Sequence, residues 1–127
     1  MLFSKKKKDS RTTLMHYEGL QGFRQDFPCK LDVDDSAIIF CNENNATIKL
    51  PFNQIQSIDF LPEVNFMGKY HNNPTSTAKA GMKWFSVINY TSSSGESKYL
   101  AFWASDSTGK NLFDEIRSKI SSGTITL

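Results

Sequence analysis

The side chains that could bind a metal ion or act as nucleophiles are few and widely spaced. The chain contains two histidines, His16 and His71, and two cysteines, Cys29 and Cys41. Their spacing matches no metal-binding pattern such as Cys-x-x-Cys or His-Glu-x-x-His, and no serine lies in a nucleophile-elbow motif. The glycines of residues 19–22 lack the strand-to-helix setting of a phosphate-binding loop. We therefore expect no metal ion, no cofactor and no enzymatic activity.

The positions of these residues indicate structural roles instead. His16 lies at the start of the predicted domain, where a packed or half-exposed imidazole is expected. Cys29 alternates with apolar residues on a predicted strand and is expected to fill the core as a small hydrophobic side chain. A two-residue turn after that strand would pair Cys29 with Phe40, whereas a three-residue turn would set it opposite Cys41. Both registers remain open, and a cytoplasmic location favours free thiols in either.

Alternation of apolar and polar residues predicts a series of short β-strands. In residues 27–33 the odd positions are apolar, which is typical of a half-buried strand. Residues 83–90 carry large apolar groups on both faces and therefore indicate a central strand. The stretch 62–82 is irregular and is expected to form a short strand and a long exposed loop. The other predicted strands cover residues 37–41, 46–50, 55–61 and 98–103.

After the last predicted strand the apolar pattern changes to a helical period. Residues 106–108 can cap the start of this helix, and Gly123 can end it. Residues 124–127 are expected to be frayed or paired with a strand edge. About seven short antiparallel strands and one helix predict a mainly β barrel or sandwich that the C-terminal helix closes. The helix has an apolar face of Leu112, Phe113, Ile116 and Ile120, opposite Lys110, Asp114, Arg117 and Ser118.

Positive charge is concentrated at the N-terminus. The 127 residues carry a formal net charge of +2, but the first eleven contain five basic side chains and one acid, so residues 12–127 carry −2. Residues 1–13 hold too little apolar surface to be ordered and are expected to form a flexible tail. Clustered lysines attract anionic lipid or nucleic acid, and the alternative is a solubilising tail. The basic residues are Lys5, Lys6, Lys7, Lys8 and Arg11.

The length allows one domain, which we place at residues 14–123. No apolar run approaches the roughly 20 residues of a membrane span. No apolar stretch follows the N-terminal charges as it would in a signal peptide. We expect a cytoplasmic protein that the lysine cluster can bring to a membrane surface.

Residues 64–83 form the most distinctive predicted surface, because aromatic side chains alternate with lysines there. Such a surface suits a protein partner, a single-stranded nucleic acid or a membrane. Since no stacking motif of an RNA-binding fold is present, nucleic acid is disfavoured. The alternative is that these aromatic side chains pack back on the barrel. The candidate partner-binding residues are Phe66, Lys69, Tyr70, His71, Lys79 and Lys83.

Four stretches of the chain carry a resemblance to a known family. They are residues 17–20 (Tyr-Glu-Gly-Leu), 28–40 (Pro-Cys-Lys-Leu-Asp-Val-Asp-Asp-Ser-Ala-Ile-Ile-Phe), 48–58 (Ile-Lys-Leu-Pro-Phe-Asn-Gln-Ile-Gln-Ser-Ile) and 99–102 (Tyr-Leu-Ala-Phe). Together they resemble bacterial pleckstrin-homology-like domains of the GRAM-like kind, over about residues 14–120. The resemblance implies a seven-stranded, strongly bent β-sandwich closed by a C-terminal helix. That fold serves lipid headgroups, phosphopeptides and protein surfaces alike.

The chain departs from the lipid-binding relatives at one turn. Those relatives carry basic residues on the first two strands and in the turn between them. Here that turn is expected at Asp34 and Asp35, with Asp32 before it and Lys30 as the one base. Because carboxylates repel a polyphosphate, this turn disfavours headgroup binding. The polar stretch 68–83 also replaces an apolar insert of many bacterial relatives and disfavours a membrane-embedded hairpin.

The leading hypothesis is therefore a non-enzymatic interaction module that binds a protein partner through residues 64–83 or a strand edge. The alternative is peripheral binding to anionic membrane lipids through the N-terminal lysine cluster. Strand edges of an open barrel also allow a homo-oligomer, without fixing its stoichiometry.

Overall fold

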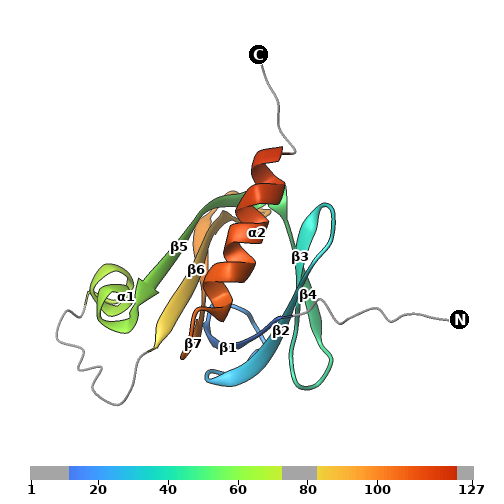
Figure 1. Ribbon diagram of the computed structural model, residues 1–127. Coiled ribbons are helices and arrows are strands. Elements are labelled where there is room, and N and C mark those ends of the chain that lie inside the picture. Colours follow the sequence, from blue (N-terminus) through green and yellow to red (C-terminus); the bar gives the residue numbers. More distant parts are fainter. Residues whose placement is uncertain (1–11, 73–82, 123–127) are drawn as a thin grey trace, which may run out of the picture.

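The computed structural model describes residues 12–72 and 83–122, which form one antiparallel sheet with two α-helices (Figure 1). The chain is mainly β, as the alternating pattern predicts. The helices are α1 (Glu63–Tyr70) and α2 (Thr108–Ser122), and a short 3₁₀ turn, η2 (Phe52–Gln54), connects β4 to β5. The strands are β1 (Thr12–Glu18), β2 (Phe27–Val33), β3 (Ala37–Cys41), β4 (Thr47–Pro51), β5 (Ile55–Pro62), β6 (Trp84–Thr91) and β7 (Ser97–Ala104).

The seven strands lie in the order β4-β3-β2-β1-β7-β6-β5, and all neighbours are antiparallel. Within the described residues the sheet is not closed, since β4 and β5 are its two edges. The prediction of a mainly β fold with seven antiparallel strands is confirmed, and in the part of the chain that the structure describes these strands form an open sheet. Figure 1 shows α2 lying across the bent sheet, with β5 and β6 on one side and β3 and β4 on the other.

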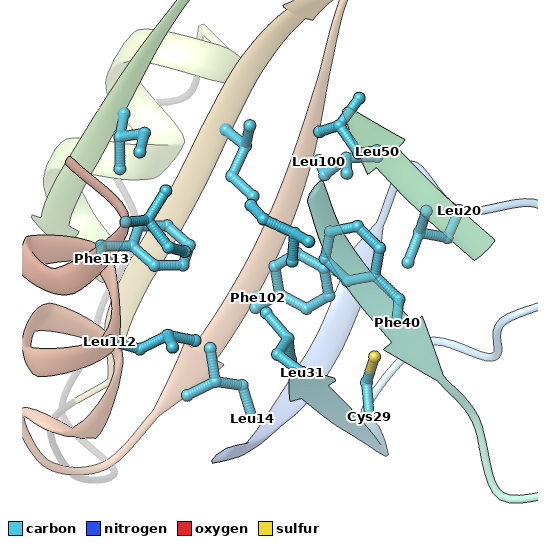
Figure 2. Packing of buried hydrophobic residues seen from close by; sticks show 14 of the residues in the cluster. Leu14, Leu20, Cys29, Leu31, Phe40, Leu50, Leu100, Phe102, Leu112 and Phe113 are labelled. Carbon is cyan, nitrogen blue, oxygen red and sulfur yellow. The ribbon is translucent and has the colours of Figure 1, made fainter. Parts of the chain in front are cut away.

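The inner face of the sheet and α2 enclose the main core, seen in Figure 2. Leu112, Phe113 and Ile116 are buried, which confirms the predicted apolar face of the helix. Opposite them, the rings of Phe40 and Phe102 stack with centroids 5.4 Å apart, although they come from strands far apart in the sequence. The C-terminal helix therefore packs on the inner face of the bent sheet, whereas the sequence predicted a helix that closes a barrel or sandwich.

Strand β6 is buried on both faces. Phe85 and Val87 point to the outer face, whereas Ser86 and Ile88 point to the core under α2, and all four are at most 1% exposed. This arrangement confirms the prediction of a central strand.

The prediction of a short strand and an exposed loop after residue 62 is wrong for its first part. Residues from Glu63 to Tyr70 form α1, which packs on the outer face of the sheet. Pro62 precedes the first turn and Glu63 lies in it, both of which favour a helix start. Phe66 and Tyr70, one helical turn apart, point to the sheet and supply the apolar face that the sequence pattern had obscured.

The first strand also differs from the expectation. β1 begins at Thr12, so the last two residues of the segment expected to be a tail belong to a strand. The sheet has seven strands because β1 is present, and not because residues 62–72 add one. As a consequence, the Asp34–Asp35 turn joins the second and third strands, not the first and second. The connection between the first two strands is residues 19–26, so the carboxylates of Asp34 and Asp35 do not lie in the turn expected for them.

Neither register considered for the cysteines is observed. Leu31 pairs with Phe40 and Lys30 with Cys41, so the connection is longer than either predicted turn. The carboxylate of Asp34 stabilises the longer turn by accepting hydrogen bonds from the amides of Ser36 and Ala37, each at 2.8 Å. Cys29 is fully buried in the core and Cys41 lies half-buried on the opposite face, and both thiols are free.

His16 fixes the loop between β1 and β2. Its side chain is 3% exposed. Nε2 accepts a hydrogen bond from the amide of Leu20 at 3.2 Å, so Nδ1 carries the proton and donates to the carbonyl of Arg24, also at 3.2 Å. Burial lowers the pKa of the imidazole, and the hydrogen bond to Arg24 opposes that shift only in part. His16 is thus a packed, neutral histidine, one of the two roles expected for it.

Candidate interaction surfaces

Helix α1 carries three of the predicted partner-binding residues, Phe66, Lys69 and Tyr70, and a fourth, His71, follows its last turn. Phe66 is the most deeply buried of them. Its side chain is fully buried, stacked on Phe85 with ring centroids 4.2 Å apart and edge-on to Tyr17. A partner on the surface of the folded protein does not contact such a side chain. Phe66 instead joins α1 to the sheet.

Lys69 and Tyr70 both bind the carboxylate of Asp59 on β5. Lys69 Nζ and the Tyr70 hydroxyl donate to Asp59 Oδ2 at 2.7 and 2.5 Å, and the amide of Asn89 donates to the Tyr70 hydroxyl at 3.0 Å. Partial burial by itself raises the pKa of Asp59, but the hydrogen bonds from Lys69 and Tyr70 outweigh it and lower the pKa. The C-terminal end of α1 is therefore held against β5, the strand that directly precedes it, by an ion pair and a hydrogen bond to Asp59.

His71 and Tyr99 share a second carboxylate, that of Glu18 at the end of β1. His71 Nε2 lies 2.7 Å from Glu18 Oε2, and the Tyr99 hydroxyl donates to the same oxygen at 2.5 Å. Burial, followed by the bond to Glu18, raises the pKa of Tyr99. The rings of Tyr70 and Tyr99 lie 4.7 Å apart and connect the two carboxylate groups into one cluster.

The remaining predicted residues are not all described by the structure. Lys83 lies next to β6, with Nζ 4.5 Å from the ring centroid of Trp103 in a cation–π contact. Lys79 and the N-terminal residues Lys5, Lys6, Lys7, Lys8 and Arg11 lie outside the described residues.

The structure thus brings Phe66, Lys69, Tyr70 and His71 together. Their side chains contact residues of the sheet, however, instead of forming an outward-facing surface. The residues that the sequence alone did not reveal are Glu18, Asp59, Asn89 and Tyr99, which come from four different strands. Only the spacing of Phe66 and Tyr70 after Pro62 could have indicated a helix there. On the outward face of α1 lies Val64, which is 42% exposed.

A groove runs along the free edge of β5, beside α2. It has a volume of about 320 Å³ and is lined by Ile55, Gln56, Ser57, Ile58, Arg117 and Ile120. Its isoleucines continue the core under α2, on which Ile55 and Ile120 pack. The groove therefore offers an apolar floor next to a strand edge that no other strand of the described ranges pairs with.

Arg117 shows the direction of the backbone groups along this edge. Its Nη2 donates to the carbonyl oxygen of Ile58 at 2.7 Å, so that carbonyl points away from β6. Because residues two apart on a strand direct their backbone groups to the same side, the amide and carbonyl of Phe60 also point outward. The free edge of β5 thus presents peptide groups that an extended chain can bind.

A second hollow lies where α2 approaches η2 and the Asp34–Asp35 turn. Its volume is about 370 Å³, and its lining mixes charges of both signs, from Asp35, Lys49 and Lys119, with Phe52 and Ile120. Opposite charges at one rim give no preference for an anion or a cation. The β5 groove is the better-defined surface, because it combines an apolar floor with oriented backbone groups.

Comparison of the sequence with protein-family models and with curated proteins gives no significant match. Across residues 12–72 and 83–122, no group of three or more histidine, cysteine, aspartate or glutamate side chains is arranged to hold a metal ion. In the same ranges, no helix is both long and apolar enough to cross a membrane. Fold and surface together define a mainly β protein, in which an antiparallel sheet of seven strands packs against a C-terminal helix.

Proposed function

We propose that the chain is a non-enzymatic, pleckstrin-homology-like interaction module that binds a partner protein at the edge of β5. The partner contributes an extended segment, which adds to the sheet beside β5 as a further strand. The observation that carries the proposal is the edge of β5, which has no second neighbouring strand among the described residues, next to the groove lined by Ile58, Arg117 and Ile120.

The chemistry of the groove indicates what the segment looks like. The backbone of the segment forms hydrogen bonds with the outward amide and carbonyl groups of Ile58 and Phe60. Because Arg117 donates to the Ile58 carbonyl in the structure, that hydrogen bond must break before the segment can bind there. Because side chains of a strand alternate between two faces, every second residue of the segment faces the groove. Those residues are apolar, since Ile55, Ile58 and Ile120 form the floor.

A peptide selection tests this proposal without knowledge of the partner. A random peptide library is panned on the full chain, and the selected peptides are titrated into ¹⁵N-labelled protein. We expect sequences with apolar residues at alternate positions, and amide shifts concentrated at Ile58 and Phe60. Residues of the other sheet edge, β4, are the internal control, because they are equally free of a second neighbouring strand within the described residues.

A pair of variants on α2 checks the location of the bound peptide. Ile120→Glu places a charge in the groove, whereas Ser118→Glu places the same charge on the exposed side of the helix. Peptide binding should be lost in the first variant and kept in the second, with both shown to be folded by their amide spectra. Shifts that map to β4 or to α1, or binding that survives Ile120→Glu, contradict the proposal.

Anionic lipid is a second candidate ligand, supported by the sequence of Lys5, Lys6, Lys7 and Lys8. Four adjacent lysines attract an anionic surface with about 1 kcal/mol per charge. This binding would be independent of the β5 groove.

A further inference from the structure

Arg117 is the one charged residue among the described residues that line the β5 groove. Two acceptors hold its guanidinium group. Nη1 donates to Asp114 Oδ1 at 3.1 Å, on the preceding turn of α2, and Nη2 donates to the carbonyl oxygen of Ile58 at 2.7 Å. The guanidinium group therefore occupies the place at which a segment added beside β5 would bind the Ile58 carbonyl.

A segment that binds this carbonyl takes it from Arg117. Nη2 then loses its acceptor, and a charged donor that is left unpaired at a covered interface costs free energy. Asp114 does not readily replace the lost acceptor, because Arg117 Nη1 and Lys110 Nζ already share its carboxylate. An acceptor that the segment itself supplies avoids this loss.

The charges around the groove favour a carboxylate as that acceptor. No acidic residue lines the groove in the part of the chain that the structure describes. Asp59, the neighbour of Ile58 on β5, binds Lys69 on the opposite face of the strand. Guanidinium and carboxylate groups have matching geometry, and the opposite charges strengthen the hydrogen bond between them. A carboxylate is thus a better acceptor for Arg117 than the neutral carbonyl that it replaces.

We propose that the partner segment carries a carboxylate level with Ile58, which binds the Arg117 guanidinium and frees the Ile58 carbonyl for a backbone amide of the segment. The carboxylate belongs either to an aspartate or glutamate side chain that faces the groove or to the C-terminus of a segment that ends there. This assignment rests on the proposed function, to whose apolar groove-facing residues the carboxylate is a single exception. Arg117 is then a specificity-determining residue, since a segment that is apolar throughout leaves its guanidinium group without the second acceptor.

Short synthetic peptides test the carboxylate and its source. All have threonine at alternate positions and isoleucine, leucine or valine at the positions between them. In one pair of sets both termini are blocked, and each apolar position in turn holds either glutamate or glutamine. In the other pair the apolar residues are kept, and the C-terminus is either a free carboxylate or a carboxamide.

Each peptide is titrated into the ¹⁵N-labelled full chain. We expect the best carboxylate peptide of at least one pair to bind about tenfold or more tightly than its neutral counterpart, because hydrogen bonds to charged groups are the stronger ones. The amide shifts should be concentrated at Ile58 and Phe60. A preference for glutamate assigns the carboxylate to a side chain, and a preference for the free C-terminus assigns it to the end of the segment.

A pair of variants on α2 locates the group that recognises the carboxylate. Arg117→Met removes the charge and keeps an unbranched side chain, so the preference should fall to within about twofold. Neutral peptides should bind this variant at least as tightly as the wild type, because its Ile58 carbonyl is free. Lys110→Met is the matched control, since it removes the same charge from a residue that also binds Asp114 but does not line the groove. It should keep the preference.

The outcomes separate this inference from the proposed function. Equal affinities within both pairs of sets, or a preference that survives Arg117→Met, overturn the inference. A preference that Lys110→Met abolishes as completely as Arg117→Met also overturns it. If peptides still shift the amides of Ile58 and Phe60 in those cases, the proposed function stands without the carboxylate. If no peptide of any set binds, both fail.

Discussion

The first turn of α2 lies so close to β6 that a Cβ atom on Gly109 would clash with the Oγ atom of Ser86. The same Cβ would lie 3.4 Å from the Ser86 Cβ, which is an ordinary contact distance. Ser86 Oγ is buried and has no hydrogen-bond partner among the described residues. The approach of α2 to the sheet therefore depends on a glycine in the helix and a small side chain on the strand.

Gly109→Ala should destabilise the protein by about 1–3 kcal/mol, because the added methyl group overpacks this contact. Ser86→Ala should be nearly neutral, since it removes a hydroxyl group that is buried and unpartnered. The double variant should recover most of the loss, because the clashing oxygen is gone. Urea unfolding of the four proteins measures this cycle, and additive effects of the two substitutions would contradict it.

Phe66→Ala should lower the free energy of unfolding by roughly 3–5 kcal/mol, the usual cost of removing a buried phenylalanine. The ring is fully buried between α1 and the sheet. Val64→Ala on the outward face of the same helix is the control and should change stability by less than about 0.5 kcal/mol. Similar, small effects of both substitutions would instead favour the exposed loop that the sequence predicts.

Gly19→Ala should be more harmful than Gly22→Ala, although both glycines have positive φ angles, +116° and +85°. At Gly22 an added Cβ would have no atom within 4 Å in the described structure other than those of Gly22 and its two chain neighbours, so the cost is about 1 kcal/mol for the backbone conformation. At Gly19 the Cβ would lie 2.6 Å from the carbonyl oxygen of Tyr99, in the backbone of β7. We expect roughly 2 kcal/mol of additional destabilisation there, measured by chemical denaturation.

Stability should fall below about pH 6.5, the ordinary pKa of histidine, because of His16. Above that pH the imidazole is neutral in both states and contributes no pH dependence. Between 6.5 and the lowered pKa of the folded state, only the unfolded chain binds the proton, so the free energy of unfolding drops by up to about 1.4 kcal/mol per pH unit. Below the folded pKa both states are protonated and the drop ends.

The variant His16→Gln removes this titration and should have a correspondingly smaller slope over the same pH range, even if it is less stable at pH 7. Denaturant unfolding of both proteins at a series of pH values gives the two slopes. Equal slopes would show that other groups cause the acid sensitivity.

Deletion of residues 1–11 should abolish binding to vesicles that contain anionic lipid, if the lysine cluster is a membrane-binding segment. The deletion leaves β1, which begins at Thr12, intact. Binding of the full chain should weaken strongly as the salt concentration rises, because exposed charges are screened. Sedimentation with vesicles at low and high salt measures both effects, and salt-independent binding that survives the deletion would exclude the cluster.

The sequence by itself determined the class of the fold, the extent of most strands and the buried face of α2. These features follow from local patterns, since the alternation in residues 27–33 and the spacing of Leu112, Phe113 and Ile116 are visible in short windows. It did not reveal α1, because an eight-residue helix with glycine, lysine and asparagine in it has a weak pattern of its own. Helix α1 is stabilised mainly by its contacts with the sheet.

Only the tertiary structure decided the register, the openness of the sheet and the role of the aromatic and basic residues. Glu18, Asp59 and Tyr99 lie on three strands, and their meeting with α1 depends on strand order, which no local pattern contains. The same holds for Ile58, Arg117 and Ile120, which line the β5 groove although 62 positions of sequence separate the first from the last. The sequence predicted a strand edge as a binding surface, and the packing of α2 formed the apolar groove beside the edge of β5.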